Sequence, residues 1–146
     1  PGGGPWSRAG RAEPGALEAL QKAADEIFVH DGVLDYAVRL VMATRHPAEH
    51  GLPDLAGLIA NGASPRATLG LVAAGRALAL MRGRTYVLPQ DIFDVGPDVL
   101  RHRLLLSYEA LADGVDAEAV VNRVLSTVHA PRVAPSQDNP EVLESA

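Results

Sequence analysis

The stretch over residues 66–81 is the sequence feature that most constrains the fold, because it is apolar on nearly every side of a helix. Ser64 before it is a favoured N-cap, and Pro65 suits the first helical position, where a missing N–H loses no hydrogen bond. Beyond its first residue only Thr68 and Arg76 interrupt the apolar surface. A helix that is apolar all round belongs in the interior of a protein. We therefore expect a helical domain built around this segment.

Two earlier stretches show the apolar spacing of amphipathic helices, at intervals of mostly three and four residues. They cover residues 17–28 and 34–42, and residues 30–32 separate them as a turn. The apolar side chains expected in the core are Leu17, Leu20, Ala24, Ile27, Phe28, Leu34, Ala37, Val38, Val41 and Met42. Residues 46–53 are predicted to form a loop, and residues 54–60 are predicted to form a short helix.

The second half of the sequence carries shorter elements. Residues 85–88 are β-prone, and residues 89–95 are expected to form a short helix that Gly96-Pro97 stops. The stretch 99–106 is predicted to be a short strand that pairs with residues 85–88. Asp116 suits the N-cap of a last helix. The predicted fold class is therefore mainly α, a compact bundle of five or six helices with one short β-hairpin.

The two ends of the sequence differ in composition from the part between them. Residues 1–15 are rich in Gly and Pro and hold no aliphatic side chain larger than Ala, so we expect a flexible leader or linker. Residues 131–146 contain three prolines and no periodic apolar pattern, which is typical of a flexible tail. The folded helical domain is predicted over residues 16–130.

Several residue types that catalysis or metal binding requires are missing or misplaced. The absence of cysteine excludes disulfides, thiolate metal sites and cysteine nucleophiles. The single lysine, Lys22, follows Gln21, so the chain has no Gly-Lys-Ser/Thr phosphate loop. His46 and His50 lie four residues apart, but Pro47 breaks a helix between them and no Glu completes a zinc motif. We expect no metal site and no complete small enzyme.

Charge and hydropathy limit the partners and the location. The net charge of -5 argues against nucleic-acid binding, which needs a concentrated basic face. Arg or Gly breaks the apolar runs well short of the roughly 20 residues that a membrane span requires. No signal peptide is visible in the first residues. The sequence therefore predicts a cytoplasmic protein that has no membrane span and binds no nucleic acid.

Arg66 breaks a local rule of helix formation. The N-terminus of a helix carries roughly half a positive charge, so a cation in the first turn is unfavourable. One interpretation is functional, because residues that break local rules mark candidate sites: Arg66 would reach a phosphate bound to another domain or chain. The other interpretation is a surface arginine that bends back to a nearby carboxylate such as Asp54.

Four motifs appear in a fixed order along the chain. They are Gly62-Ala63-Ser64-Pro65-Arg66-Ala67, Gly83-Arg84-Thr85-Tyr86-Val87, Pro89-Gln90-Asp91 and Val99-Leu100-Arg101-His102-Arg103. Together they resemble the C-terminal lid of the MoxR family of AAA+ ATPases, over about residues 30–130. Leu88 stands where the family usually has a capping Thr.

The resemblance implies how such a lid works with nucleotide. The family's upstream core supplies the nucleotide loop, the magnesium-binding acid and an inter-subunit arginine. Arg66 matches the sensor-2 arginine, which contacts the γ-phosphate of ATP, and Ser64 and Pro65 belong to the same nucleotide-binding segment. ATP and Mg²⁺ are therefore expected in the full-length protein, which would be an ATPase, whereas the fragment alone needs no cofactor and is not catalytic.

The resemblance also implies partners. The lid would pack on its own upstream AAA+ core, and the full-length protein would form a ring, a hexamer, that couples ATP hydrolysis to remodelling of client proteins or to metal insertion. Proteins with von Willebrand factor A domains are an implied class of partner.

Five further residues are candidates for an interface with the core or a neighbouring subunit. They are Arg45, His46, Arg101, His102 and Arg103. For the last three a structural interpretation stays open, in which His102 is buried and the arginines pair with Asp91, Asp94 and Asp98. The alternative to a lid is a stand-alone helical module that binds proteins or DNA.

Overall fold

The computed structural model describes residue 10 and residues 13–132, and the predicted leader over 1–15 and tail over 131–146 fall mostly outside them. Within the described residues the chain forms six α-helices and a short two-stranded antiparallel sheet, which confirms the predicted mainly helical fold. The helices are α1 (Ala16–Asp25), α2 (Asp31–Arg45), α3 (Ala67–Met81), α4 (Pro89–Leu100), α5 (Tyr108–Ala112) and α6 (Ala117–Thr127).

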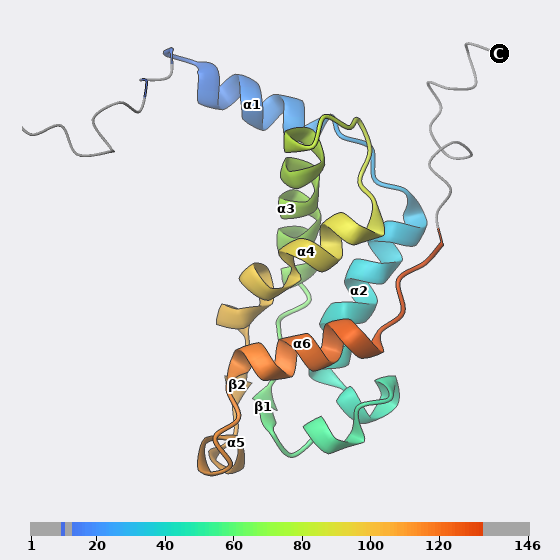
Figure 1. The fold of residues 1–146 in the computed structure, drawn as a ribbon, viewed down its shortest axis with the longest axis vertical. Coiled ribbons are helices and arrows are strands. Elements are labelled where there is room, and N and C mark those ends of the chain that lie inside the picture. The colour runs from blue at the N-terminus through green and yellow to red at the C-terminus, as the bar shows by residue number, and fades with distance from the viewer. Residues whose placement is uncertain (1–9, 11–12, 133–146) are drawn as a thin grey trace, which may run out of the picture.

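Helix α3 runs through the middle of the molecule, with α4 packed across it and α2 beside it (Figure 1). Its apolar sequence predicts burial on every side, but Leu69 and Met81 are 71% and 83% exposed. Glycine allows the close approach of α4, because a Cβ at Gly75 would lie 2.7 Å from Cδ1 of Ile92. Ile92 is fully buried at this contact, and Leu71 of α3 is fully buried as well. The small sheet lies near the N-terminal end of α3, and α1 lies near its C-terminal end (Figure 1).

Helix α4 does not stop at Gly96-Pro97 but continues to Leu100, so the predicted end of this helix is wrong. Proline inside a helix removes one hydrogen bond and strains the preceding turn. Tertiary packing compensates here, because α4 is held between α3 and α6. Gly96 is part of that packing: a Cβ there would lie 2.9 Å from Cδ2 of Leu125 on α6.

The sheet pairs different segments from those predicted. Strand β1 (Ile59–Asn61) is antiparallel to β2 (Leu105–Leu106), with Ile59 opposite Leu106. The predicted helix over 54–60 is reduced to a single 3₁₀ turn, η3 (Pro53–Leu55), and most of the stretch 99–106 is helical. Tyr86, from the segment predicted to be its partner strand, instead forms an isolated parallel bridge with Phe28. Pairing over such sequence distances leaves no local pattern, which is why periodicity missed it.

Of the core side chains predicted in this part of the chain, Ile27, Ala37 and Val41 are buried, but the prediction is wrong on α1 and shifted on α2. Helix α1 has no buried side chain, and Leu17 and Leu20 are 63% and 59% exposed. Leu34 and Val38 of α2 are also exposed, whereas the buried face of this helix lies one position away. That buried face consists of Val33, Tyr36, Ala37, Leu40, Val41, Ala43 and Thr44. Both sets have helical spacing, so contact with the other helices decided which of them is buried.

Helix α6 begins as predicted. The Asp116 side chain accepts a hydrogen bond of 2.8 Å from the backbone N–H of Ala119, which is the geometry of an N-cap. Four apolar side chains of α6 are buried, namely Val120, Val121, Val124 and Leu125. No helix among residue 10 and residues 13–132 is both long and apolar enough to cross a membrane.

Candidate functional site

The segment Gly62–Arg66 crosses the C-terminal end of α2 in close backbone contact. A Cβ at Gly62 would lie 2.6 Å from the carbonyl carbon of Thr44 and 2.7 Å from Cα of Arg45. The Thr44 hydroxyl accepts a hydrogen bond of 3.0 Å from the N–H of Ala63 and donates one to the carbonyl oxygen of Val41. Only glycine fits at this crossing, so the segment has a fixed position on α2.

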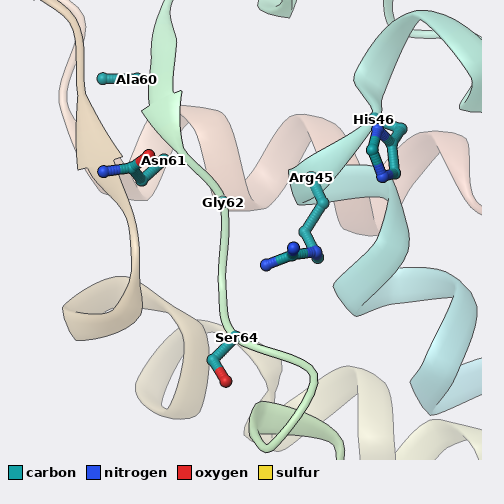
Figure 2. A pocket seen from close by; sticks show the side chains of 6 residues that line it. All are labelled: Arg45, His46, Ala60, Asn61, Gly62 and Ser64. Carbon is teal, nitrogen blue, oxygen red and sulfur yellow. The ribbon is translucent and has the colours of Figure 1, made fainter.

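A pocket of about 360 Å³ opens beside this crossing (Figure 2). Its lining residues are Arg45, His46, Ala60, Asn61, Gly62 and Ser64. Arg45 is oriented by a hydrogen bond of 3.2 Å from Nη1 to the carbonyl oxygen of Ala63. The structure thus brings three of the predicted site residues, Arg45, His46 and Ser64, to one pocket, and none of the described residues that line it is a carboxylate.

The regular part of α3 begins at Ala67, so its N-cap residue is Arg66 and the predicted N-cap at Ser64 is wrong. The preceding turn is closed by hydrogen bonds from Ala67 N–H to the Ser64 carbonyl (2.8 Å) and from Thr68 N–H to the Pro65 carbonyl (3.1 Å). The Ser64 hydroxyl lies 3.3 Å from the backbone nitrogen of Arg66 and accepts its hydrogen bond. Ser64 therefore supports the turn that carries Arg66, and Pro65 lies within that turn.

The Arg66 side chain is exposed and has no hydrogen-bond or ion-pair partner among the described residues. The interpretation that pairs it with Asp54 is wrong, because Asp54 accepts an ion pair of 2.9 Å from Arg123 instead. Ala63 and Ala67 on either side of this turn are fully buried. The guanidinium of Arg66, which has no partner among the described residues, thus extends from a turn that is anchored by buried residues on both sides.

The triplet Arg101-His102-Arg103 forms the short 3₁₀ helix η4 and does not line the pocket. Arg101 pairs with Asp98 (3.3 Å) and with Glu118 of α6 (3.2 Å). His102 is exposed, so the interpretation that buried it is wrong. Arg103 donates from Nε to the carbonyl oxygen of Val99 at 3.1 Å and pairs with no acid within the described residues.

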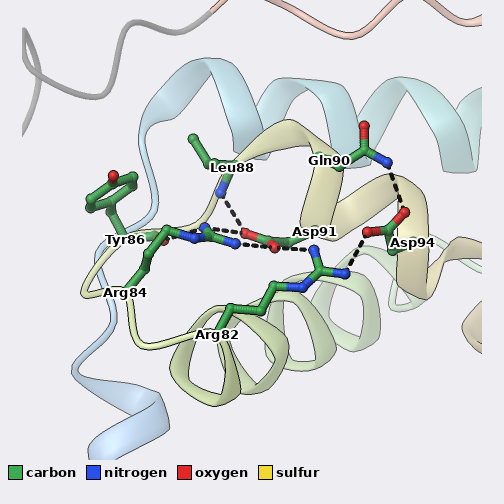
Figure 3. Close-up of polar contacts among 7 residues, drawn as sticks. All are labelled: Arg82, Arg84, Tyr86, Leu88, Gln90, Asp91 and Asp94. Atoms are coloured by element: carbon green, nitrogen blue, oxygen red, sulfur yellow. Dashed lines mark hydrogen bonds and ion pairs between the residues drawn. The ribbon is translucent and has the colours of Figure 1, made fainter.

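Asp91 is the one acid that the described structure buries completely. It lies among the side chains of Arg82 and Arg84 (Figure 3). Arg84 donates two hydrogen bonds to it, of 2.6 and 2.5 Å, and Arg82 donates one of 2.9 Å. Burial alone would raise the pKa of Asp91, but the hydrogen bonds from Arg84 and from the backbone N–H of Leu88 outweigh it and hold the pKa below 3.8. The same contacts raise the pKa of Arg84.

This cluster explains the Gly83–Val87 and Pro89–Asp91 motifs structurally. Asp91 caps α4 in place of the side chain at Leu88, because its Oδ2 accepts the Leu88 N–H at 2.7 Å. Asp91 and Asp94 are therefore engaged by Arg82 and Arg84, and not by the triplet as proposed above. The sequence contained a signal for this arrangement, because Asp91 stands three residues after Leu88, whose side chain cannot cap a helix.

The described residues include no group of three or more His, Asp or Glu side chains arranged to hold a metal ion. The side chains of Arg66, Arg103 and Arg45 have no carboxylate partner among the described residues, so they remain available to an anion.

Comparison with known proteins shows the class of this fold. A family profile described as the AAA lid domain matches residues 56–124. A crystal structure of a protein provisionally assigned as an ATPase, from Cytophaga hutchinsonii, matches with a TM-score of 0.73 and 37% identity. That match covers 76% of this chain and 34% of the other. The chain therefore contains an AAA lid domain.

Two sequence relatives indicate which family of AAA proteins this lid is related to. The chain is 53% identical to Chaperone MoxR1 of Mycobacterium tuberculosis over 136 residues, which is 90% of this chain and 36% of the relative. It is 39% identical to Protein MoxR of Paracoccus denitrificans over 102 residues, or 66% of this chain and 30% of the relative. The lid is thus related to the C-terminal region of the MoxR family, which confirms the resemblance seen in the motifs. The chain spans about a third of the length of these relatives.

Proposed function

We propose that this lid covers ATP held by a P-loop core elsewhere in the same protein, and that Arg66 contacts the γ-phosphate. The observation that carries the proposal is the Arg66 side chain, which is exposed and without a partner among the described residues, at a fixed turn beside a polar pocket. Its planar fork suits phosphate oxygens, and the start of α3 adds a favourable field for an anion.

The position of Arg66 on α3 supports a sensing role. Helix α3 has 15 residues, so it extends about 22 Å from the turn at Arg66 to the Arg82–Asp91 cluster at its other end. Because α3 packs against α1, α2 and α4, a pull on Arg66 moves the lid as one body. Loss of the γ-phosphate would release Arg66 and allow the lid to rotate away from the core.

The remaining expectations belong to the whole ATPase. The core supplies the phosphate loop and the acid that holds Mg²⁺, since this chain has no Gly-Lys-Ser/Thr loop. The exposed Leu17 and Leu20 of α1 support a partner surface, for which the core is the natural occupant.

We further propose a hexameric ring that works in the cytoplasm, with von Willebrand factor A-type proteins as partners. The chaperone name of the mycobacterial relative supports client remodelling, with metal insertion as the other form of output.

The test is ATP hydrolysis by the separately prepared core, with and without this chain. Arg66→Ala should lower the lid-stimulated rate about tenfold or more, the effect of one charge-assisted hydrogen bond. Arg123→Ala is the matched control, because Arg123 is also exposed but already pairs with Asp54. An unchanged stimulated rate with Arg66→Ala would show that the sensor role is wrong.

The same proteins test the alternative of a stand-alone DNA-binding module. Under the proposed function, duplex DNA should not bind this chain, whose net charge is -5. Salt-dependent binding to duplex DNA, together with no effect of the chain on the core's ATP hydrolysis, would favour the alternative.

A further inference from the structure

We propose that Arg103 is a second anion-binding arginine, which together with Arg66 forms a paired site for the terminal phosphates of a nucleoside triphosphate. The inference rests on the proposed function and adds to it a residue from a different motif. In this proposal Arg103 of the η4 triplet binds the anion, and Arg101 of the same triplet does not.

The first argument is the position of the Arg103 guanidinium on α3. An ideal Cβ built at Gly70 would lie 3.4 Å from Nη2 of Arg103 and 3.9 Å from its Cζ. Gly70 follows Arg66 by four residues, so both lie on the same face of the helix, about 5–6 Å apart between Cβ positions. The Arg103 head group therefore rests on the face of α3 that begins with Arg66.

The second argument is the glycine itself. Gly70 lies within a helix, where glycine is less favourable than any residue except proline. A Cβ at this position would lie 3.3 Å from Cγ1 of Val99 and nearly as close to Arg103, and a larger side chain would occupy the place of the guanidinium. Glycine thus leaves room for Arg103 on α3, where the Nε hydrogen bond to the Val99 carbonyl also holds it.

The third argument is charge. Arg101, two residues earlier, is neutralised by Asp98 and Glu118, whereas Arg103 and Arg66 have no acidic partner among the described residues. The charges of Arg66 and Arg103 thus stay uncompensated by any described carboxylate, in a chain that has 18 acidic and 13 basic side chains. Two like charges on one helix face repel each other, and an anion that contacts both removes that repulsion.

The chemistry of the pair favours phosphate over a single carboxylate. Each guanidinium presents a planar fork of donors, and a terminal phosphate has three oxygens that can accept from both forks at once. A triphosphate extends over several ångströms, so neighbouring phosphate groups can also be shared between the two arginines. The paired site is therefore suited to the end of a triphosphate chain.

The test is a titration of this chain with inorganic tripolyphosphate, followed by NMR of the arginine Nε–Hε groups. We expect the signals of Arg66 and Arg103 to shift together along one saturable curve, while that of Arg101 does not move. Arg66→Ala and Arg103→Ala should each weaken the affinity about tenfold. Arg101→Ala is the matched control from the same triplet and should change the affinity less than twofold. Arg103→Lys, which keeps the charge and loses the fork, should lie between.

Circular dichroism of each variant shows that it is folded before its affinity is compared. The paired site is wrong if Arg66 responds without Arg103, if Arg103→Ala behaves like Arg101→Ala, or if neither arginine gives a saturable shift. The core-stimulated ATP hydrolysis assay separates this failure from failure of the proposed function. A large effect of Arg66→Ala with none of Arg103→Ala in that assay would leave the sensor role standing without the pair.

Discussion

The buried carboxylate of Asp91 gives the most sharply defined prediction. Asp91→Asn keeps the size of the side chain and removes its charge, so it leaves no cavity. In the structure this carboxylate accepts hydrogen bonds from Arg82, from Arg84 and from the backbone N–H of Leu88. The variant would turn an amide toward two guanidiniums and leave Arg84, whose side chain is 19% exposed, without its counter-charge.

The expected loss of stability follows from these contacts. Removing one partner of a buried ion pair costs about 3–5 kcal/mol in the free energy of unfolding. Arg82 and Arg84 remain in partial contact with water, which screens their charges, so we expect the lower end, about 3 kcal/mol. For a folded unit of about 120 residues this corresponds to a decrease in Tm of roughly 12 °C.

The assay is urea unfolding at neutral pH, followed by far-ultraviolet circular dichroism, with thermal unfolding as a second measurement. Asp94→Asn is the matched control, because Asp94 accepts from Arg82 at 2.7 Å but is partly exposed. Its loss should be at most about 1 kcal/mol. If Asp91→Asn lowers the free energy of unfolding no more than Asp94→Asn does, the cluster does not stabilise the fold as argued.

Two further predictions concern the pH dependence of the Asp91 contribution to stability and the close backbone contact at Gly62. Because the pKa of Asp91 is lowered in the folded state, its contribution is fully present above the unfolded value, near 3.8, and is lost as the pH falls through the folded value. The stability difference between wild type and Asp91→Asn should therefore shrink in urea titrations below about pH 4, and a constant difference would contradict the assignment. Gly62→Ala should cost about 1–3 kcal/mol in urea unfolding and reduce stimulation of the core, since its Cβ meets the backbone of α2. Gly57→Ala is its control, because the added Cβ would meet only the flexible end of Glu109; equal losses would show that the crossing at Gly62 tolerates a side chain.

The sequence predicted the elements whose causes are local. The long apolar run over 66–81 could be satisfied in water only as an interior helix, and it is the central helix of the fold. Asp116 caps α6 because a short acceptor side chain bonds the free N–H groups of the next turn wherever the helix lies. The order of the motifs likewise indicated the family, since it depends on spacing along the chain alone.

The candidate site was predicted in part. The misplaced charge of Arg66 was visible as a violation of helix electrostatics, but whether a carboxylate neutralised it depended on where Asp54 and Arg123 meet in space. The same holds for the triplet, in which Arg101 pairs with Asp98 and Arg103 pairs with no acid in the part of the chain that the structure describes. Neighbours in sequence received different surroundings because a short 3₁₀ turn points their side chains toward different helices.

The sequence by itself thus determined the longer helices, where α6 begins, and that Arg66 opposes the field of its own helix. Tertiary structure decided which of two overlapping apolar stripes of α2 faces inward, that α4 continues through Pro97, and that β1 pairs with β2. It also decided that Leu17 and Leu20 stay exposed. The physical reason is range: capping, helix propensity and periodicity act within a few residues, whereas burial, ion pairing and strand pairing depend on segments that only folding brings together.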